Sequence, residues 1–269
     1  MIAFLNAACI IFRNFTAQVR QIGMEIVDSL CRWLRDEVER ANARGIVLGL
    51  SGGVDSAVVA ALGNRALGKN VLALIMPCHS LKKDGDDARE VANLLKVKIE
   101  TVDLGGVYDT LTGCLPRAPK YVTANLKPRL RMLTLYHYAR LLNYLVAGTG
   151  NKSEISVGYF TKHGDGGVDI FPLGDLYKWE VRSIARNLGL PERIVTRTPS
   201  AGLFPGQTDE QELGISYEEL DRTIACIEGG AGIGMKNDPL VAKVSELMKN
   251  SLHKRAPIPV FRKGTGSGS

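Results

Sequence analysis

Residues 51–56 read Ser-Gly-Gly-Val-Asp-Ser, a combination that could bind the phosphates of a nucleotide. Consecutive glycines let the backbone approach an anion, and serine hydroxyls and the N–H groups at a helix start donate hydrogen bonds to it. Asp55 adds a negative charge that a bridging Mg²⁺ would offset, since Mg²⁺ is commonly held by one or two carboxylates and phosphate oxygens. The alternative interpretation is an ordinary glycine turn with a serine cap.

The spacing in this segment excludes two common nucleotide-binding loops. No lysine follows the glycines, as it does in Gly-x-x-x-x-Gly-Lys-Ser/Thr, and the glycines do not form Gly-x-Gly-x-x-Gly. These differences argue against transfer of the γ-phosphoryl group and against hydride chemistry.

The segment lies between a short apolar run and an alanine- and valine-rich stretch, which are typical of a buried strand and the helix that follows it. The same alternation continues along the chain, and short connections between such elements predict a parallel sheet with right-handed crossovers. We therefore expect a single-domain, doubly wound α/β fold. The expected strands are 46–50, 71–76, 98–102 and 144–147, and the expected helices are 24–43, 54–67, 84–95, 123–142, 176–188, 217–228 and 240–252. Residues 196–212 show no periodicity and are expected to form a loop, which at this length usually has a function.

The composition limits the class of protein. No apolar run approaches the ~18 residues that span a bilayer, which excludes an integral membrane protein. The net charge of +6 favours anionic ligands without distinguishing small phosphates from nucleic acid. The five cysteines are scattered and form no Cys-x-x-Cys pair, so we expect a reducing cytoplasm as the compartment. Residues 1–21 are expected to be an N-terminal extension and 263–269 a flexible tail of the kind that cloning leaves.

The Ser-Gly-Gly-x-Asp-Ser segment resembles the phosphate loop of the N-type ATP pyrophosphatases, which cleave ATP between its α- and β-phosphates. Further motifs narrow the choice within that group. They are Gly-Thr-Gly-Asn-Lys-Ser-Glu at 148–154, the stretches 158–169, 172–178 and 208–214, Asn125-x-x-x-Arg129-x-Arg131-Met132, and His253-Lys254-Arg255. Together they closely resemble the NAD synthetases, over a domain at 22–262. Glutamine-using forms carry a long glutaminase domain, and only about 45 residues precede the first strand here, so the resemblance implies the ammonia-dependent type.

The resemblance implies that deamido-NAD⁺, ATP and ammonia are converted into NAD⁺, AMP and pyrophosphate in the last step of NAD biosynthesis. Mg²⁺ is the implied cofactor and ATP the co-substrate. Oxide is a poor leaving group, so the carboxylate must first be activated by adenylation. A homodimer is also implied, because the family builds its dinucleotide site across a subunit boundary, whereas no nucleic acid or membrane is expected as a partner.

The resemblance also assigns residues to ATP and the metal. Asp55 and Glu154 are the expected metal ligands, although a solvated carboxylate at a helix start is a simpler interpretation of Glu154. Lys178 is expected to neutralise charge on the phosphates, and its simpler interpretation is an exposed helix lysine. The expected ATP-binding residues are Gly49, Leu50, Ser51, Gly52, Gly53, Val54, Asp55, Ser56, Thr149, Lys178 and Ser200.

A further group is expected to bind deamido-NAD⁺. The spacing of Asn125, Arg129, Met132 and Tyr136 predicts one shared helix face, and a half-buried surface stripe would show the same spacing. Asp165 is the residue expected to orient ammonium and take its proton, although Asp-Gly turns are common. The expected deamido-NAD⁺ residues are Asn125, Arg129, Tyr136, Lys162, Asp169, His253 and Lys254, and the expected catalytic residues are Asp165, Lys178 and Asp55.

Two rival functions use the same kind of loop. A tRNA-modifying enzyme that adenylates a base would carry a basic tail or an appended RNA-binding domain, and the sequence shows neither. A nucleotide-binding module without catalysis is disfavoured because Asp55, Glu154 and Lys178 occur together.

Overall fold

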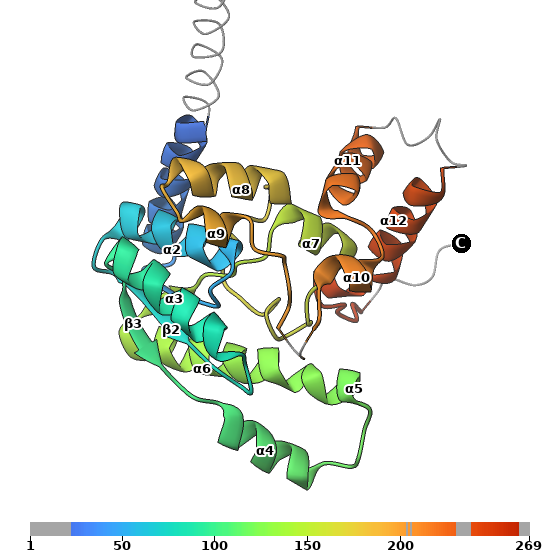
Figure 1. Cartoon of the computed structure of the whole chain (residues 1–269), viewed down its shortest axis with the longest axis horizontal. Helices are drawn as coiled ribbons and strands as arrows, with labels where there is room; N and C mark the ends of the chain where they lie inside the picture. The colour runs from blue at the N-terminus through green and yellow to red at the C-terminus, as the bar shows by residue number, and fades with distance from the viewer. Residues whose placement is uncertain (1–22, 203, 205, 230–237, 264–269) are drawn as a thin grey trace, which may run out of the picture.

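A parallel sheet forms the centre of the protein (Figure 1). The computed structural model describes residues 23–202, 204, 206–229 and 238–263, so the predicted extension at 1–21 and residues 264–269 of the predicted tail lie outside the described residues. Within the described ranges four strands pair in the order β3-β2-β1-β4. They are β1 (Gly45–Gly49), β2 (Val71–Ile75), β3 (Lys98–Thr101) and β4 (Tyr144–Val146). The pairings are parallel, which confirms the predicted parallel α/β fold.

Helices connect the strands and cover the sheet (Figure 1). Two of them, α2 (Val54–Leu67) and α11 (Tyr217–Glu228), have the bounds predicted from the sequence. The others are 23–40, α3 (Lys82–Leu95), α4 (Gly105–Cys114), α5 (Lys120–Ala124), α6 (Leu126–Leu142), α7 (Lys152–Val157), α8 (Lys178–Asn187), α9 (Glu192–Val195), α10 (Asp209–Leu213), α12 (Pro239–Asn250) and α13 (Leu252–Arg255).

The central strands bury alternate residues on opposite faces of the sheet. Ile46 and Leu48 of β1 belong to one apolar cluster with residues of α2 and α8, whereas Val47 belongs to a second cluster with Ala139 of α6. This is the period of two expected of a strand buried on both sides. The strand order changes direction between β1 and β4, and ligands of open α/β sheets bind at the carboxyl ends of the strands at such a point.

A third apolar cluster joins α7, α10, α11 and α12 beside the sheet (Figure 1). Its buried members include Val157 of α7, Tyr217 and Ile224 of α11, and Val244 of α12. This cluster fixes the start of α11 against α7, the helix that carries Glu154.

Most predicted elements differ from the structure only at their ends, and two differ by more than that. The helix predicted at 123–142 is interrupted at Asn125, because Pro128 lacks an N–H and its ring would clash with the carbonyl of residue 124 in a continuous helix. The loop predicted at 196–212 ends at Thr208, whose hydroxyl accepts a hydrogen bond from the Gln211 N–H at 3.4 Å and so starts α10. Five helices were not predicted from the sequence: the short α7, α9, α10 and α13, and α4, which contains glycines. A helix of only a few turns shows too little apolar periodicity to be recognised in a sequence.

Candidate active site

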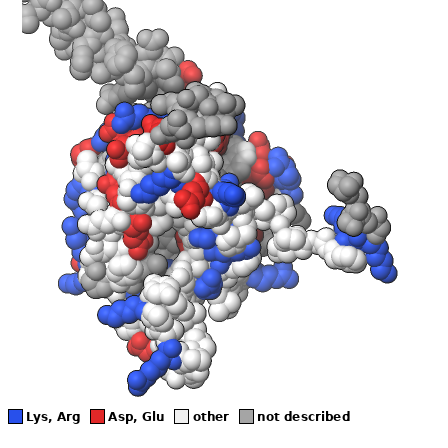
Figure 2. Space-filling view, turned by 90° about the vertical axis from the view of Figure 1, so that its right-hand side faces the viewer, with Lys and Arg blue, Asp and Glu red and all other residues white. Residues whose placement is uncertain are grey.

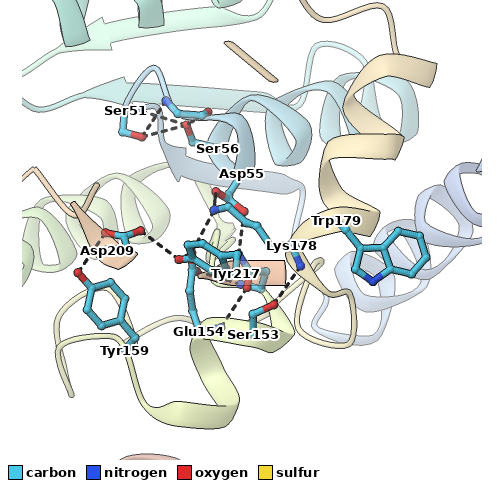
Figure 3. Close-up of polar contacts among 12 residues, drawn as sticks. Ser51, Asp55, Ser56, Ser153, Glu154, Tyr159, Lys178, Trp179, Asp209 and Tyr217 are labelled. Atoms are coloured by element: carbon cyan, nitrogen blue, oxygen red, sulfur yellow. Dashed lines mark hydrogen bonds and ion pairs between the residues drawn. The ribbon is translucent and has the colours of Figure 1, made fainter. Parts of the chain in front are cut away.

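The 51–56 loop is closed by its own serine hydroxyls (Figure 3). Ser56 Oγ donates to the Gly53 carbonyl oxygen at 3.0 Å and accepts from the Ser51 N–H at 3.2 Å, and the two hydroxyl oxygens lie 3.1 Å apart. The loop leads into α2, whose N-cap residue is Gly53 and has no side chain to cap the helix. Backbone N–H groups at this helix start therefore suit an anion, as the sequence pattern predicts.

The surroundings of position 52 require glycine. Its φ is +80°, and a Cβ there would lie 2.7 Å from the Asp84 carbonyl oxygen and 2.9 Å from Asp87 Cβ in α3. Arg197 adds a cation, because its Nη1 donates to the Gly52 carbonyl oxygen at 3.3 Å and to Asp87 at 2.9 Å, and its Nη2 pairs with Asp84. The segment after Arg197 is thus anchored to the phosphate loop.

Lys178 joins residues that follow two neighbouring strands (Figure 3). It is the first residue of α8, and its side chain is 2% exposed. Its Nζ lies 2.6 Å from Asp55 Oδ2, 3.2 Å from Glu154 Oε1 and 4.9 Å from the centre of the Tyr217 ring. Asp55 follows β1 and Glu154 follows β4, so the carboxyl ends of adjacent strands bring the two carboxylates together. The interpretation of Lys178 as an exposed helix lysine is wrong.

Asn151 orients both carboxylates. Its Nδ2 donates to Asp55 Oδ1 at 2.9 Å, and its Oδ1 accepts from the Glu154 N–H at 3.1 Å. Its own N–H donates to Glu154 Oε2 at 3.3 Å, which completes a capping box at the start of α7. Glu154 therefore does begin a helix, and it also turns Oε1 toward Lys178.

Negative charge exceeds positive charge around this lysine. Burial raises the pKa of Glu154 above its ordinary value, and Asp55 adds to this effect although Lys178 opposes it. Burial also opposes the charge on Lys178, but Asp55 and Glu154 outweigh it and raise the lysine pKa, so the ammonium keeps its proton. Asp209 contributes a further negative field to both groups.

This surplus of carboxylate fits a divalent cation that binds together with a nucleotide. In the part of the chain that the structure describes, no three or more His, Cys, Asp or Glu side chains are grouped to hold a metal alone. Asp55 and Glu154 supply two carboxylates, and Mg²⁺ usually takes one or two from the protein and its other ligands from phosphates and water.

Several residues predicted for the dinucleotide meet along the 158–169 segment. Arg129 Nη2 donates to the Lys162 carbonyl oxygen at 3.3 Å, and Lys162 Nζ donates to the His253 carbonyl oxygen at 2.6 Å. Asn125 is the N-cap residue of α6, and Arg129 Nη1 donates to its carbonyl oxygen at 3.2 Å. The Asn125 side chain accepts from the Thr161 hydroxyl at 2.8 Å. Parts of the chain that are distant in sequence thus converge here.

Asp165 and Lys254 bind the same segment from two sides. Asp165 Oδ1 accepts from the Thr161 N–H at 2.9 Å, and Lys254 Nζ donates to the carbonyl oxygens of Gly158 at 2.6 Å and Phe160 at 2.9 Å. Water reaches Asp165, yet the surrounding protein atoms raise the pKa of its carboxyl through desolvation.

Tyr136 and Asp169 form a separate pair. The Tyr136 hydroxyl donates to Asp169 Oδ1 at 3.0 Å, and Asp169 Oδ2 accepts from the Val146 N–H at 2.8 Å. Burial and the neighbouring carboxylate raise the pKa of Tyr136 to about 12, so the phenol remains a neutral donor. This pair connects α6 to the end of β4.

The remaining predicted ATP residues differ in exposure. Leu50 and Val54 are 2% and 4% exposed, so they can offer backbone groups while their side chains pack in the core. Gly49 ends β1, Thr149 is half-buried after β4, and Ser200 is exposed in the segment between α9 and α10.

Sequence analysis did not single out Arg197, Asp209 or Tyr217. Asp209 lies in the 208–214 motif, which was the available signal for it. Arg197 in a loop and Tyr217 at a helix start have no local pattern that distinguishes them from surface residues.

Residues 26–258 match the family model of NAD synthase. The chain belongs to the NAD synthase family. It is 50% identical over 236 residues to the NH₃-dependent NAD⁺ synthetase of Carboxydothermus hydrogenoformans, which covers 86% of this chain and 94% of that protein. A solved structure of NMN synthetase from Francisella tularensis is 35% identical with a TM-score of 0.79. NH₃-dependent NAD synthetase from Campylobacter jejuni in complex with nitrate is 30% identical with a TM-score of 0.78, and both matches cover 89% of this chain and 99% of the other.

Membership of the NAD synthase family confirms the resemblance and the enzyme class predicted from the motifs. As an NAD synthase, the protein is a ligase that uses ATP and forms a carbon–nitrogen bond. Of the helices that the structure describes, none is long and apolar enough to cross a membrane.

Proposed function

We propose that this NAD synthase amidates deamido-NAD⁺ with ammonia at the expense of ATP, and releases NAD⁺, AMP and pyrophosphate. Two similar proteins named as NH₃-dependent synthetases support ammonia as the nitrogen donor. The observation that carries the proposal is the contact of Lys178 with Asp55 and Glu154 beside the phosphate loop. A buried cation and two carboxylates in this position suit a metal-bound triphosphate.

The reaction has two steps. The deamido-NAD⁺ carboxylate attacks the α-phosphorus of ATP, the bond from that phosphorus to the bridging oxygen breaks, and pyrophosphate leaves. Ammonia then attacks the carboxyl carbon of the mixed anhydride, and AMP leaves with one of the former carboxylate oxygens. The first step is needed because oxide cannot leave from an unactivated carboxylate.

The residues around the phosphate loop serve the first step. The 51–56 loop holds the outgoing pyrophosphate through backbone N–H groups and serine hydroxyls. Asp55 and Glu154 would hold Mg²⁺, which when bound neutralises phosphate charge. Lys178 stabilises the negative charge that moves onto the leaving group, and such electrostatic stabilisation is usually the largest contribution to catalysis.

The cationic side chains near the 158–169 segment bind the dinucleotide, and Asp165 acts in the second step. Arg129, Lys162 and Lys254 offer positive charge to the phosphates of deamido-NAD⁺. Asp165 orients ammonium and accepts its proton, and a carboxyl group whose pKa lies above its ordinary range suits this role.

We also propose a homodimer, supported by exposed apolar side chains of α5 and α6. Leu133 and Leu141 of α6 are 65% and 67% exposed and lie eight residues apart, hence on the same helix face. Tyr121 of the preceding α5 is 70% exposed. Sedimentation of Leu133→Asp should show monomers where the wild-type protein sediments as a dimer, and an unchanged dimer would contradict this interface.

A reducing cytoplasm is the proposed compartment. Three cysteines that the structure describes, Cys31, Cys78 and Cys114, are free thiols. Cytosolic reductants keep such thiols unpaired.

Product analysis tests the proposed function against its rivals. On the face shown in Figure 2, basic and acidic side chains are interspersed, which does not favour a tRNA substrate. The similarity to an NMN synthetase makes the deamido mononucleotide the substrate to compare with deamido-NAD⁺. Purified protein with ATP, Mg²⁺ and ammonium should form NAD⁺ and AMP from deamido-NAD⁺ in preference to the mononucleotide, and glutamine should not replace ammonium. Failure to release AMP with either substrate would contradict the proposal.

A further inference from the structure

We infer that Asp209 is a positioning residue that couples the Ser200 segment to Glu154 and Lys178, and that the Tyr217 hydroxyl transmits this coupling. The inference rests on the proposed function, in which Ser200 and Lys178 contact ATP. Asp209 and Tyr217 act on these residues and not on the substrate.

Asp209 holds the backbone next to Ser200. It begins α10 and is 4% exposed. Its N–H donates to the Pro199 carbonyl oxygen at 3.1 Å, and the Ala201 N–H lies close enough to its carboxylate to lower the carboxyl pKa, against the stronger effect of burial. Ser200 is exposed and its hydroxyl accepts from the Gly202 N–H at 3.1 Å, so the Asp209 contact helps to place the backbone that carries this hydroxyl.

The Asp209 carboxylate is also connected, through Tyr217, to the cluster of Lys178, Asp55 and Glu154 (Figure 3). The Tyr217 hydroxyl lies 3.0 Å from Asp209 Oδ2 and 3.1 Å from Glu154 Oε1, the oxygen that contacts Lys178. The Tyr159 hydroxyl lies 3.0 Å from Asp209 Oδ1. An unbroken series of polar contacts therefore leads from the backbone beside Ser200 to the Lys178 ammonium.

Through Tyr217, the connection between Asp209 and Glu154 depends on which cation lies beside Glu154. A phenol has one proton, and this hydroxyl has two carboxylate neighbours, so it can donate to only one of them at a time. At the other carboxylate the two oxygens lack a shared proton and repel, and a cation beside Glu154 offsets this repulsion; Lys178 is that cation here. A change in the cation at Glu154 therefore redistributes the Tyr217 hydrogen bond, and Asp209 passes this change to the backbone at Pro199, next to Ser200.

The other side of the segment is anchored independently. Arg197 binds the Gly52 carbonyl oxygen and the side chains of Asp84 and Asp87. Ser200 is thus held between the phosphate loop and the Glu154 cluster. Loss of the Tyr217 hydroxyl should loosen one of these two attachments and leave the fold intact, because a phenylalanine ring still fills the apolar cluster that contains Leu220 and Ile224.

Tyr217→Phe tests the inference, with Tyr177→Phe as the matched control. Tyr177 packs against the same apolar cluster, its hydroxyl lies 3.1 Å from the Glu228 carboxylate, and the Lys152 ammonium lies 4.8 Å from its ring centre. Its carboxylate partner lies outside the Lys178 cluster. Calorimetric titration with ATP and Mg²⁺ in the absence of deamido-NAD⁺ should show about tenfold weaker binding for Tyr217→Phe, the usual effect of losing a hydrogen bond to a charged group, and no change for the control.

Steady-state kinetics separate positioning from a structural role. We expect the KM for ATP to rise about tenfold in Tyr217→Phe while the KM for deamido-NAD⁺ stays within about twofold. Asp209→Asn should have a similar effect, and the double variant should lose little more than the worse single variant, because both changes break one connection.

Three results would overturn the inference. One is equal ATP affinity in Tyr217→Phe and Tyr177→Phe, and another is a lower melting temperature and kcat with every KM unchanged. The third is additive losses in the double variant. If the wild-type protein formed no NAD⁺, the proposed function would fail, and the calorimetric comparison would still decide whether Tyr217 influences nucleotide binding.

Discussion

Replacing Lys178 by methionine should strongly destabilise the protein, because it leaves two carboxylates close together without their shared cation. The side chains of Lys178, Asp55 and Glu154 are 2%, 17% and 16% exposed. Breaking such a buried pair costs about 3–5 kcal/mol in the free energy of unfolding. The remaining carboxylates can recover part of this energy by binding a proton, so the loss should be larger at pH 8 than at pH 5. Urea denaturation of the metal-free variant and wild type at both pH values measures it.

Lys152→Met is the matched control for this experiment. Lys152 Nζ also contacts two carboxylates, those of Asp175 at 3.1 Å and Glu228 at 2.8 Å, and lies over the ring of Tyr177. These carboxylates are 95% and 42% exposed, so the substitution should cost at most about 1 kcal/mol. Equal losses from the two lysine substitutions, or a Lys178→Met loss that is the same at both pH values, would refute the argument that burial sets the magnitude.

Three further substitutions test individual contacts. Burial raises the pKa of Glu154 above its ordinary 4.5, so the folded metal-free protein should lose stability as the pH rises from about 4.5 toward neutral. Glu154→Gln should flatten that part of the denaturation profile in EDTA, and an unchanged slope would contradict the assignment. Asp55→Asn should reduce AMP release by at least about 100-fold with an unchanged circular dichroism spectrum, and a variant that keeps most of its rate would refute its role at the metal. Arg197→Met should raise the KM for ATP by about tenfold through its contact with the Gly52 carbonyl, whereas a change confined to the KM for deamido-NAD⁺ would argue against that contact.

The sheet and the longer helices could be predicted because their signals are local. Short apolar runs marked β1 and β2, the first of them bounded by glycines, and α2 and α11 follow uninterrupted helical patterns to their observed ends. The break at Asn125 was also readable from Pro128, but the apolar pattern extends across it and suggested one helix.

The environment of the site residues could not be predicted in the same way. The burial of Lys178 depends on Asp55 and Glu154, which come from other elements and meet only when β1 and β4 are adjacent. The position of Tyr217 depends likewise on the packing of α11 against α7. Motifs thus indicated which residues matter, whereas the fold determines which of them share a proton or a charge.

Oxygen isotope transfer tests most directly whether the substrate carboxylate attacks the α-phosphorus of ATP. Deamido-NAD⁺ labelled with ¹⁸O in its carboxyl group would be converted with unlabelled ATP, Mg²⁺ and ammonium, and the nucleotide products analysed by mass spectrometry. We predict one labelled oxygen in each AMP and none in pyrophosphate. Unlabelled AMP, or the accumulation of ADP and phosphate, would contradict the adenylation of the substrate at this site.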